Sequence, residues 1–410
     1  MNKTICIFED SKFKNFLPLT YFRPVYDLRC GILTIAEKIK KYSQTSNIIL
    51  HSRKYLANYL REDKKSYKVN NYDESRILFI NGRLLPSPEI MNTLLLEGDD
   101  EIFTNNNKVI AARLSNENIS KLIGNNKDVL SDFSMLSCKQ TELEAYLFEY
   151  PWHLIQKNGE EISNDIKLIS PKITDNNFEG VHLINKENIF IGNNVNIKPN
   201  VVLDASDGPI FIEDEVTIFP NTYIVGSAYI GKKSLVKANT QIYQDTSIGP
   251  VCKVGGEIEN SIIHSYSNKQ HEGFLGHAYL GSWINIGASS NNSDLKNDYS
   301  KIKVILNGEE VDTGTNFMGL IMGDHSKCAI NTAFNTGTVI GVSCNIYGSG
   351  FPPKYVPSFS WGGAEGLREY HLRKAIEVAK IVKSRRNISM SVNDLELFKF
   401  VFDLTQAERK

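Results

Sequence analysis

Residues 212–254 read IEDEVTIFPNTYIVGSAYIGKKSLVKANTQIYQDTSIGPVCKV, and an aliphatic residue stands at every sixth position of this stretch. The aliphatic series is Ile212, Ile218, Ile224, Ile230, Val236, Ile242, Ile248 and Val254. A period of six is neither the 3.6-residue period of a helix nor the two-residue period of an ordinary strand. It predicts a parallel β-helix, in which each hexapeptide forms one face of a prism and its aliphatic residue points inward.

The period extends on both sides of this stretch. Its further members are Ile191, Ile197 and Leu203 upstream, and Phe274, Leu280, Ile286, Met322, Cys328, Phe334, Ile340 and Ile346 downstream. Gly231 and Gly249 follow aliphatic residues and predict corners with positive φ, which glycine adopts at little cost. Residues 204–209 and about 289–317 interrupt the period, and long loops that leave a rigid solenoid often carry function.

Residues 1 to about 180 lack the six-residue period. Short apolar runs alternate there with helix-like stretches, and this alternation predicts an α/β layer with a mainly parallel sheet. The strand-like runs are Ile5–Phe8, Asn47–Leu50 and Arg76–Ile80, and the helix-like stretches are Ile32–Tyr42 and Thr141–Glu149.

The sequence therefore predicts three parts: an α/β domain over 1–180, a β-helix over 181–350 and a C-terminal helical cap over 351–410. The Pro-rich segment Phe351–Pro357 ends the solenoid, and two helical patterns follow, Ala364–Arg386 and Val392–Arg409. A cap is expected because an open solenoid end leaves sheet hydrogen bonds and apolar surface bare.

Composition limits the class of protein. A chain of 410 residues with a net charge of −1 and interspersed charges does not present the basic excess of a nucleic-acid-binding protein. We expect no signal peptide, because the first residues do not show its pattern, and no membrane span, because no apolar run approaches the roughly 18 residues that a span requires. The six cysteines are scattered without a C-x-x-C pair, so we expect reduced thiols in a cytoplasmic protein that binds neither nucleic acid nor membrane.

Three short motifs resemble one enzyme family. They are Ile248-Gly-Pro-Val-Cys-Lys253, His271-Glu-Gly-Phe-Leu-Gly276 and Asn285-Ile-Gly-Ala288. They are similar, in the same order, to the I-G-P-F-A-R, H-x-x-Y-L-G and N-I-G-A motifs of the bifunctional N-acetylglucosamine-1-phosphate uridylyltransferase/glucosamine-1-phosphate N-acetyltransferases. The sequence around these motifs is most similar to that of the divergent branch of the family in Bacteroidetes-like bacteria. The resemblance is strongest over 240–300 and implies a left-handed β-helix, a sugar nucleotidyltransferase-like N-terminal domain and a homotrimer.

The resemblance implies an acyl-transfer site in the prism. His271 falls on the catalytic histidine, where an imidazole near its natural pKa would take the proton of an amine that attacks acetyl-CoA. The alternative is an ordinary corner residue. Lys253 occupies the position at which the family has an arginine that binds the sugar phosphate. A lysine keeps the positive charge but cannot form the two parallel hydrogen bonds of a guanidinium. The other implied substrate contacts are Lys269, Phe274, Asn285, Lys296, Asn297 and Tyr299.

The N-terminal domain departs from the family pattern. Its first turn, Ile7–Phe13, contains no glycine, whereas the family has a Gly-rich loop that binds nucleotide phosphates. Arg83 of Asn81-Gly82-Arg83 stands where the family has an aspartate that binds Mg²⁺, and an arginine cannot bind a cation. The implied nucleotide contacts are Asp10, Arg23, Arg29, Arg83 and Asp165. The alternative is that these residues form structural ion pairs around a lost site.

Four histidines of the prism suggest a possible metal site, because prismatic trimers such as the γ-carbonic anhydrases bind zinc through histidines: His264, His271, His277 and His325. The acidic and amide residues that accompany such a site do not surround them in the sequence, so no protein-bound metal is predicted there.

The leading hypothesis is a two-site enzyme of amino-sugar nucleotide biosynthesis. The prism would acetylate glucosamine 1-phosphate from acetyl-CoA, and the front domain would transfer a uridylyl group from UTP, with Mg²⁺, to N-acetylglucosamine 1-phosphate. One alternative is a nucleotidyltransferase for another hexose 1-phosphate with a purely structural prism. The other is a non-catalytic trimeric scaffold or regulatory subunit.

Overall fold

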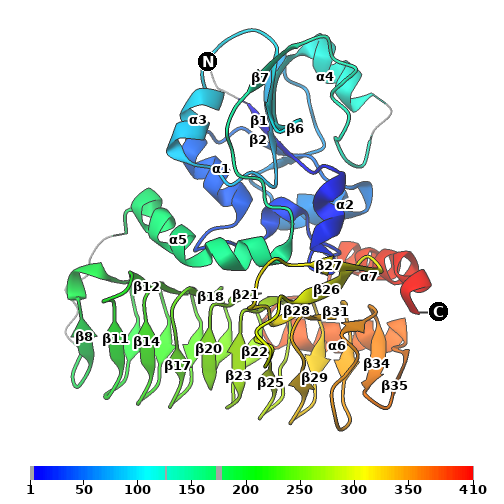
Figure 1. Ribbon diagram of the computed structural model, residues 1–410. Helices are drawn as coiled ribbons and strands as arrows, with labels where there is room; N and C mark the ends of the chain where they lie inside the picture. The colour runs from blue at the N-terminus through cyan, green and yellow to red at the C-terminus, as the bar shows by residue number, and fades with distance from the viewer. Residues whose placement is uncertain (1–3, 125–126, 172–177, 410) are drawn as a thin grey trace.

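A computed structural model describes residues 4–124, 127–171 and 178–409. Figure 1 shows an α/β domain that stands on one long side of a prism made of short, stacked strands. This arrangement confirms the fold class predicted from the sequence, a nucleotidyltransferase-like α/β domain followed by a left-handed parallel β-helix and C-terminal helices.

The N-terminal domain is built on one seven-stranded sheet of order β3-β2-β1-β4-β6-β5-β7. β1 is parallel to β2 and β4, whereas β6 is antiparallel to both of its neighbours. All four residues of β1 are buried, as expected of a parallel strand covered on both faces. The strands are β1 (Ile5–Phe8), β2 (Ile48–Leu50), β3 (Lys68–Val69), β4 (Arg76–Asn81), β5 (Glu101–Asn105), β6 (Lys108–Ser115) and β7 (Lys139–Glu142).

Of the two helices predicted for this domain, the one over Ile32–Tyr42 is present as α1 and the other is absent, and α2 to α5 were not among the predicted elements. α1 begins at a capping box in which Thr34 and Glu37 bind each other's backbone amides. The prediction of a helix over Thr141–Glu149 is wrong, because β7 pairs with β5 and the chain then runs extended past Leu84, so tertiary pairing overrides local propensity. The helices are α1 (Ile35–Ser43), α2 (Lys54–Asp63), α3 (Pro88–Leu94), α4 (Asn116–Ile123) and α5 (Pro151–Ile169).

The prism has three faces, which each coil visits in the same order. The first face holds β10 (Asn196–Ile197), β13 (Thr217–Ile218), β16 (Leu235–Val236), β19 (Lys253–Val254) and β22 (Asn268–Lys269), and later β29 (Lys327–Cys328) and β32 (Asn345–Ile346). The second face holds β8 (His182–Ile184), β11 (Val202–Asp204), β14 (Tyr223–Val225), β17 (Gln241–Ile242), β20 (Glu257–Glu259) and β23 (Phe274–Gly276). The third face holds β9 (Ile189–Ile191), β12 (Ile210–Ile212), β15 (Ala228–Ile230), β18 (Thr246–Ile248), β21 (Ile262–Ser265), β24 (Tyr279–Ser282), β28 (Leu320–Met322), β31 (Thr338–Ile340) and β33 (Tyr355–Val356).

The aliphatic residues of the six-residue period point into the prism, as the sequence predicts. All eight aliphatic residues from Ile212 to Val254 are 0% exposed and pack on one another inside the prism. Burial of this continuous apolar column is the main stabilising interaction of the solenoid, since each coil covers the apolar residues of the next.

Two details differ from the prediction. Gly231 and Gly249 do not have positive φ. They allow coils to approach closely, because a Cβ on Gly249 would lie 1.6 Å from the carbonyl oxygen of His264. The coil after Val254 is shorter, since Ile248 pairs with Ile263, and the inward residue of β23 is therefore Leu275 rather than Phe274.

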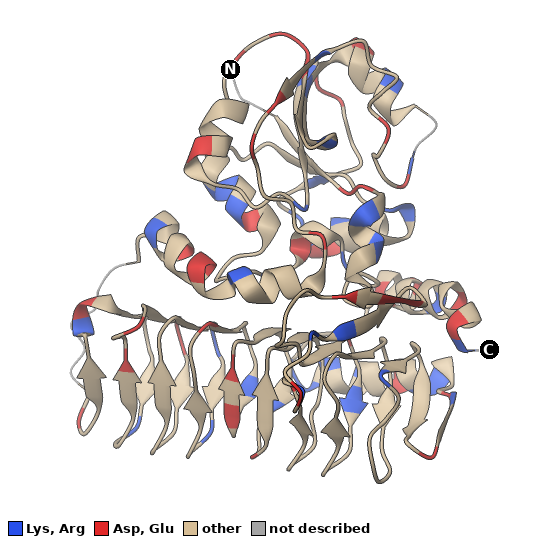
Figure 2. Ribbon diagram, viewed as in Figure 1, with Lys and Arg blue, Asp and Glu red and all other residues tan. Residues whose placement is uncertain are grey.

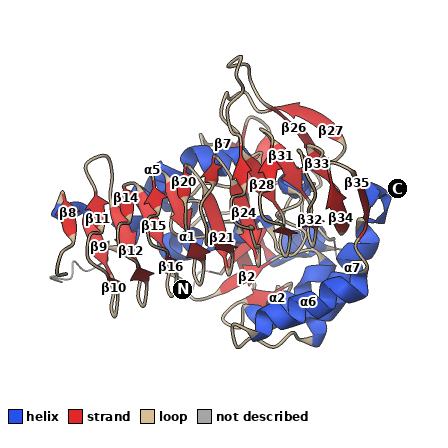
Figure 3. Cartoon of the chain, turned by 90° about the horizontal axis from the view of Figure 1, so that it is seen from below, coloured by secondary structure: helices blue, strands red, loops and turns tan. Residues whose placement is uncertain are grey.

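The end of the prism also carries strands that the sequence did not predict. β33 and β34 (Ser360–Gly363) continue the coils past residue 350, and β34 turns back into β35 (Gly366–Glu369) within the segment predicted as helix. Two helices follow, α6 (Leu372–Ser384) and α7 (Val392–Leu404), and they lie beside the last coils and next to α2 (Figure 3).

The excursion over 289–317 adds two small elements to the prism. β25 (Asn291–Asn292) pairs with β30 (Ala333–Phe334), and β26 (Lys303–Leu306) and β27 (Glu309–Asp312) form an antiparallel hairpin that projects from the prism (Figure 3). No helix of the described residues is long and apolar enough to cross a membrane. Both signs of charge are interspersed over the two domains (Figure 2).

The two domains are joined through the third face, on which α5 lies. The Ser247 hydroxyl donates a 2.8 Å hydrogen bond to the carbonyl of Gly31, and the Tyr279 hydroxyl accepts one of 2.8 Å from the amide of Arg29. Beside these contacts the ammonium of Lys38, 1% exposed, lies 2.6 Å from Glu161 and also pairs with Asp165. The polar groups that are buried where the two domains meet therefore form hydrogen bonds and ion pairs with one another.

We predict that Lys38→Met strongly destabilises the protein at neutral pH. The methionine fills a similar volume but leaves Glu161 and Asp165 buried without a counter-charge, which costs about 3–5 kcal/mol. The free energy of unfolding from urea denaturation measures the change. The control is Lys157→Met, which removes an exposed pair with Glu160 and should cost at most about 1 kcal/mol. Equal effects of the two substitutions would contradict the prediction.

Candidate functional site

The sheet of the N-terminal domain has a topological switch point between β1 and β4. The chain passes from β1 to β2 and β3 on one side, and β4 then lies on the other side of β1. Open α/β sheets bind ligands outside the carboxyl ends of the strands at such a point. Glu9 and Asp10 follow β1 there, and Gly82 and Arg83 follow β4.

The charged groups at this switch point bind one another. Asp10 accepts hydrogen bonds of 2.9 Å from Nε of Arg83 and of 2.9 Å from the Asn81 amide. Arg83 is 1% exposed and also lies 3.1 Å from Glu149. Glu9 is buried and paired with Arg53 at 3.0 Å. Each carboxylate is thus matched to an arginine, and the described residues do not offer the free oxygens that a Mg²⁺ ion requires.

Three predicted nucleotide contacts lie instead at the interface between the domains. Arg23 pairs with Asp324 of the prism and donates a 3.0 Å hydrogen bond to Ser282. The guanidinium of Arg29 lies over the ring of Tyr229, 5.6 Å from its centroid. Asp165 accepts hydrogen bonds from the backbone amides of Ile32 and Leu33, at 2.8 and 3.0 Å, in addition to its pair with Lys38. Arg23, Arg29 and Asp165 thus make contacts where the N-terminal domain packs against the prism.

A large cavity of about 900 Å³ lies beside the switch point, between α3, the β5–β6 turn and α5. It reaches the chain after β4, where the amide of Leu85 donates to the carbonyl of Tyr146 at 2.9 Å. Its wall combines an aromatic ring with amides, carboxylates and ammonium groups, a set that suits a phosphorylated sugar. The polar lining includes Asn105, Asn106, Glu144, Lys157, Asn164 and Lys167.

In the prism, the predicted acyl-transfer residues are divided between two corners. His271 is exposed and lies at the corner between the first and second faces, before β23. Lys253 and Asn285 are on the first face, where burial, and after it the charges of Arg386 and Arg385, lower the pKa of Lys253. Phe274 is half-buried on β23, and the remaining contacts lie in the excursion, where Tyr299 is 68% exposed and the Lys296 ammonium binds the carbonyl of Lys301.

Lys269 does not face a substrate site. It occupies an inward position of the first face, next to Val254, and is 3% exposed. Its ammonium donates hydrogen bonds to the carbonyls of Gly255 at 2.9 Å and of His271 at 2.8 Å. Burial lowers the pKa of Lys269 to about 8. The prediction of a substrate contact is therefore wrong for this residue, because the shortened coil places it inside the prism.

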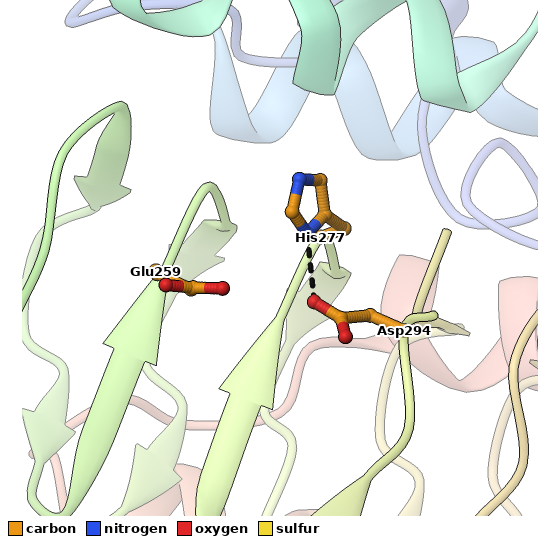
Figure 4. Close-up of side chains that lie close together, drawn as sticks. All are labelled: Glu259, His277 and Asp294. Carbon is orange, nitrogen blue, oxygen red and sulfur yellow. Dashed lines mark hydrogen bonds and ion pairs between the residues drawn. The ribbon is translucent and has the colours of Figure 1, made fainter. Parts of the chain in front are cut away.

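The other corner, between the second and third faces, holds a histidine with a carboxylate partner. His277 Nδ1 lies 2.7 Å from Asp294 Oδ2, and Glu259 lies next to both (Figure 4). An ionised carboxylate can only accept, so Nδ1 carries the proton and Nε2 presents its lone pair. Nε2 points away from Asp294 toward the helix above it (Figure 4), and it has no hydrogen-bond partner among the described residues.

This corner forms because consecutive coils stack in register. Glu259 ends β20 of one coil, and His277 follows β23 of the next coil, which pairs with β20. Asp294 follows β25 in the coil after that. Gly276 is required here, because a Cβ on it would lie 2.4 Å from Asp294 Oδ2. The fold, and not nearness in sequence, brings the three side chains together.

A cavity of about 170 Å³ opens from this corner toward α5. His277 lines it together with Trp152 and Gln156 of α5 and with Thr315 and Phe317 of the excursion. The ring of Phe317 stacks on the imidazole, with ring centroids 4.9 Å apart. An imidazole whose ring is fixed by a carboxylate and whose free nitrogen faces a cavity has the geometry of a general base.

A second stretch of the sequence also points to a functional histidine, His277. His277-Ala-Tyr-Leu-Gly281 resembles the H-x-x-Y-L-G motif: it has the tyrosine, but one residue instead of two separates the histidine from the tyrosine. His271-Glu-Gly-Phe-Leu-Gly276 fits the spacing but lacks the tyrosine. Of these two histidines the structure favours His277, because it has a carboxylate partner and lines a cavity, whereas His271 has neither among the described residues.

Comparisons with known proteins agree with both domains. A family model described as "Sugar nucleotidyl transferase" matches residues 5–173. A "Bifunctional sugar-1-phosphate nucleotidylyltransferase/acetyltransferase" of Sulfurisphaera tokodaii is 24% identical over 368 residues, which are 80% of this chain and 88% of that protein. The chain is similar to the bifunctional sugar-1-phosphate nucleotidylyltransferase/acetyltransferases.

Other relatives match over shorter lengths. The "Bifunctional protein GlmU" of Methanococcus vannielii is 25% identical over 202 residues, which cover 48% of this chain and 42% of that protein. The chain thus spans less than half the length of this relative. A solved structure of LpxA, a UDP-N-acetylglucosamine acyltransferase from Bacteroides fragilis, aligns with 57% of this chain and 84% of its own at 16% identity and a TM-score of 0.28.

We predict that Lys269→Met makes the protein more stable at pH 7 and that the gain shrinks as the pH rises. The unfolded state holds the Lys269 proton up to about pH 10.4, whereas the folded state releases it near pH 8. Keeping this buried ammonium charged costs up to about 3 kcal/mol below pH 8, and the cost is lost between pH 8 and 10.5.

The free energy of unfolding of wild type and Lys269→Met, measured at pH 7 and pH 10, checks this. Lys121→Met removes an exposed ammonium and is the control, for which the difference from wild type should not change with pH. A Lys269→Met difference that stays constant from pH 7 to pH 10 would contradict the burial of a charged amine.

Proposed function

We propose that the protein is a two-site enzyme of amino-sugar nucleotide biosynthesis. In the β-helix it transfers the acetyl group of acetyl-CoA to the amine of glucosamine 1-phosphate. In the N-terminal domain it transfers a uridylyl group from UTP to the N-acetylglucosamine 1-phosphate that results. The observation that carries the proposal is the His277–Asp294 pair at a cavity, in a chain similar to bifunctional transferases.

The residues of the corner account for the acyl-transfer step as follows. Nε2 of His277 takes a proton from the amine as the nitrogen attacks the thioester carbonyl, the C–N bond forms, and the C–S bond then breaks to release CoA. Asp294 fixes the imidazole with its proton on Nδ1 and stabilises the imidazolium that forms. Phe317 and the helix α5 limit the access of water to this proton transfer.

For the uridylyl transfer we propose that UTP binds at the switch point and that the sugar 1-phosphate occupies the cavity beside it. The carboxylates at this edge are paired with arginines, so Mg²⁺ would enter as part of the Mg·UTP substrate. We assign no metal-assisted step to the protein's own carboxylates. Lys157 and Lys167 supply positive charge in the cavity for the phosphate of the acceptor.

We also propose a homotrimer, as the resemblance implies. The apolar column is sealed within one chain, so association would use the outer faces of the prism. A closed cyclic arrangement is the usual solution for identical subunits. The molar mass in solution, measured by light scattering, tests the number of subunits.

We predict that His277→Ala lowers the kcat of N-acetylation by about 10²- to 10⁴-fold, the usual contribution of a general base. The reaction is followed as formation of N-acetylated sugar phosphate from acetyl-CoA and glucosamine 1-phosphate. His271→Ala is the matched control and should stay within about twofold of wild type, since His271 is exposed and lies outside the cavity. The opposite pattern would return the role of base to His271.

We predict that Lys167→Ala raises the KM for N-acetylglucosamine 1-phosphate in pyrophosphate release from UTP by about 10-fold or more, the effect of losing one charge-assisted contact. Lys121→Ala, an exposed lysine on α4 of the same domain, is the control. His277→Ala should leave this reaction unchanged. If wild type releases no pyrophosphate, the N-terminal half of the proposal fails and the acyl-transfer half stands by itself.

A further inference from the structure

The corner at His277 holds more ligand atoms than a general base needs. One oxygen of Glu259, one nitrogen of His277 and one oxygen of Asp294 all lie within 4.8 Å of one another. They come from three consecutive coils at the same corner of the prism, so backbone pairing fixes their separation (Figure 4). One imidazole and two carboxylates are a ligand set that leaves a position open on a four-coordinate metal ion.

The charges around this corner are unbalanced. Three carboxylates, those of Asp245, Glu259 and Asp294, surround the one imidazole. None of them is paired with a lysine or arginine among the described residues. Burial and the charge of Asp294 raise the pKa of Glu259, and burial raises that of Asp245. The cluster thus favours a cation that can contact more than one carboxylate.

We propose that Glu259, His277 and Asp294 bind a divalent transition-metal ion such as Zn²⁺, and that the bound ion switches off the acyl-transfer base. The nitrogen ligand selects this class of ion, because Mg²⁺ and Ca²⁺ prefer oxygen ligands whereas imidazole suits zinc and its neighbours. Metal–ligand distances of about 2.0–2.2 Å require the three atoms to move together. Glu259 can do so because its half-exposed side chain makes no other hydrogen bond among the described residues.

Inhibition follows from the proton balance on the ring. The ion takes the place of the proton on Nδ1 that is hydrogen-bonded to Asp294, and the ring changes tautomer: this one proton moves to Nε2 by exchange with solvent. A neutral imidazole bound through Nδ1 therefore carries its only proton on Nε2. Nε2 then has no lone pair for the amine of the acceptor, so the same histidine cannot bind the ion and act as the base. The inhibition rests on the proposed function, whereas the metal site does not.

The binding test uses the full chain after treatment with a chelator, and Zn²⁺ as the only added ligand. Isothermal titration calorimetry should show one Zn²⁺ per chain in wild type, with the Kd raised about 10- to 100-fold in Glu259→Gln and in Asp294→Asn. The matched control is Glu257→Gln, two residues earlier on the same strand and outside the ligand set, which should bind as wild type does. Circular dichroism shows whether each variant is folded.

Three results would overturn the site: no stoichiometric binding by wild type, equal binding by Glu259→Gln and wild type, or equal weakening by Glu257→Gln. The switch is tested by adding Zn²⁺ to the N-acetylation reaction, where the rate should fall at the Kd measured for binding and recover with chelator. Binding without inhibition overturns the switch alone. A chain that binds Zn²⁺ at this corner but does not acetylate the acceptor overturns the proposed acyl transfer and leaves the metal site standing.

Discussion

The whole structure depends on the backbone hydrogen bonds that stack one coil of the prism on the next. Each coil pairs residue for residue with its neighbours, as Ile224 does with Ile242 and Ile230 with Ile248. The aliphatic column inside and the three outer faces both follow from this register, because side chains at equivalent positions of successive coils must lie one above another. A corner that carries polar residues in three coils therefore becomes a fixed cluster, and the cluster at His277 arises in this way.

The docking of the two domains explains a second set of charges. Residues that the family resemblance assigns to nucleotide binding, Arg23 and Asp165 among them, are buried where the α/β domain meets the third face. Breaking these contacts would expose uncompensated charges, so docking and rigidity are linked. The same interface brings α5 over the corner of His277 and makes one wall of its cavity. The N-terminal domain thus forms part of the wall around His277, the proposed base, whatever its own chemistry.

The six-residue period predicted the prism from the sequence, but it did not predict which side chains the stacked coils bring together. The period from Ile212 to Val254 determines the prism, because an apolar residue at every sixth position supplies the column that fills its interior. The six-residue period does not predict the inward position of Lys269, because the coil after Val254 is shorter and shifts the register. The pairing of Val254 with Lys269 in the structure shows this shift. Likewise the partner of His277 lies seventeen residues away in the next coil, and a motif centred on consecutive residues does not reach it.

The stacked geometry links the general base and the metal site proposed for this corner. A base needs one carboxylate on its far nitrogen, and a third coil with an acidic residue at the same position adds a second carboxylate with no role in orienting the ring. Glu259 is that residue, and its charge is a cost unless a cation offsets it. A divalent ion bound to Nδ1 of His277 and to the two carboxylates would offset it. In the proposed mechanism the ring can accept a proton at Nε2 or bind the ion at Nδ1 but cannot do both, and the acidic surplus around His277 would then control the base.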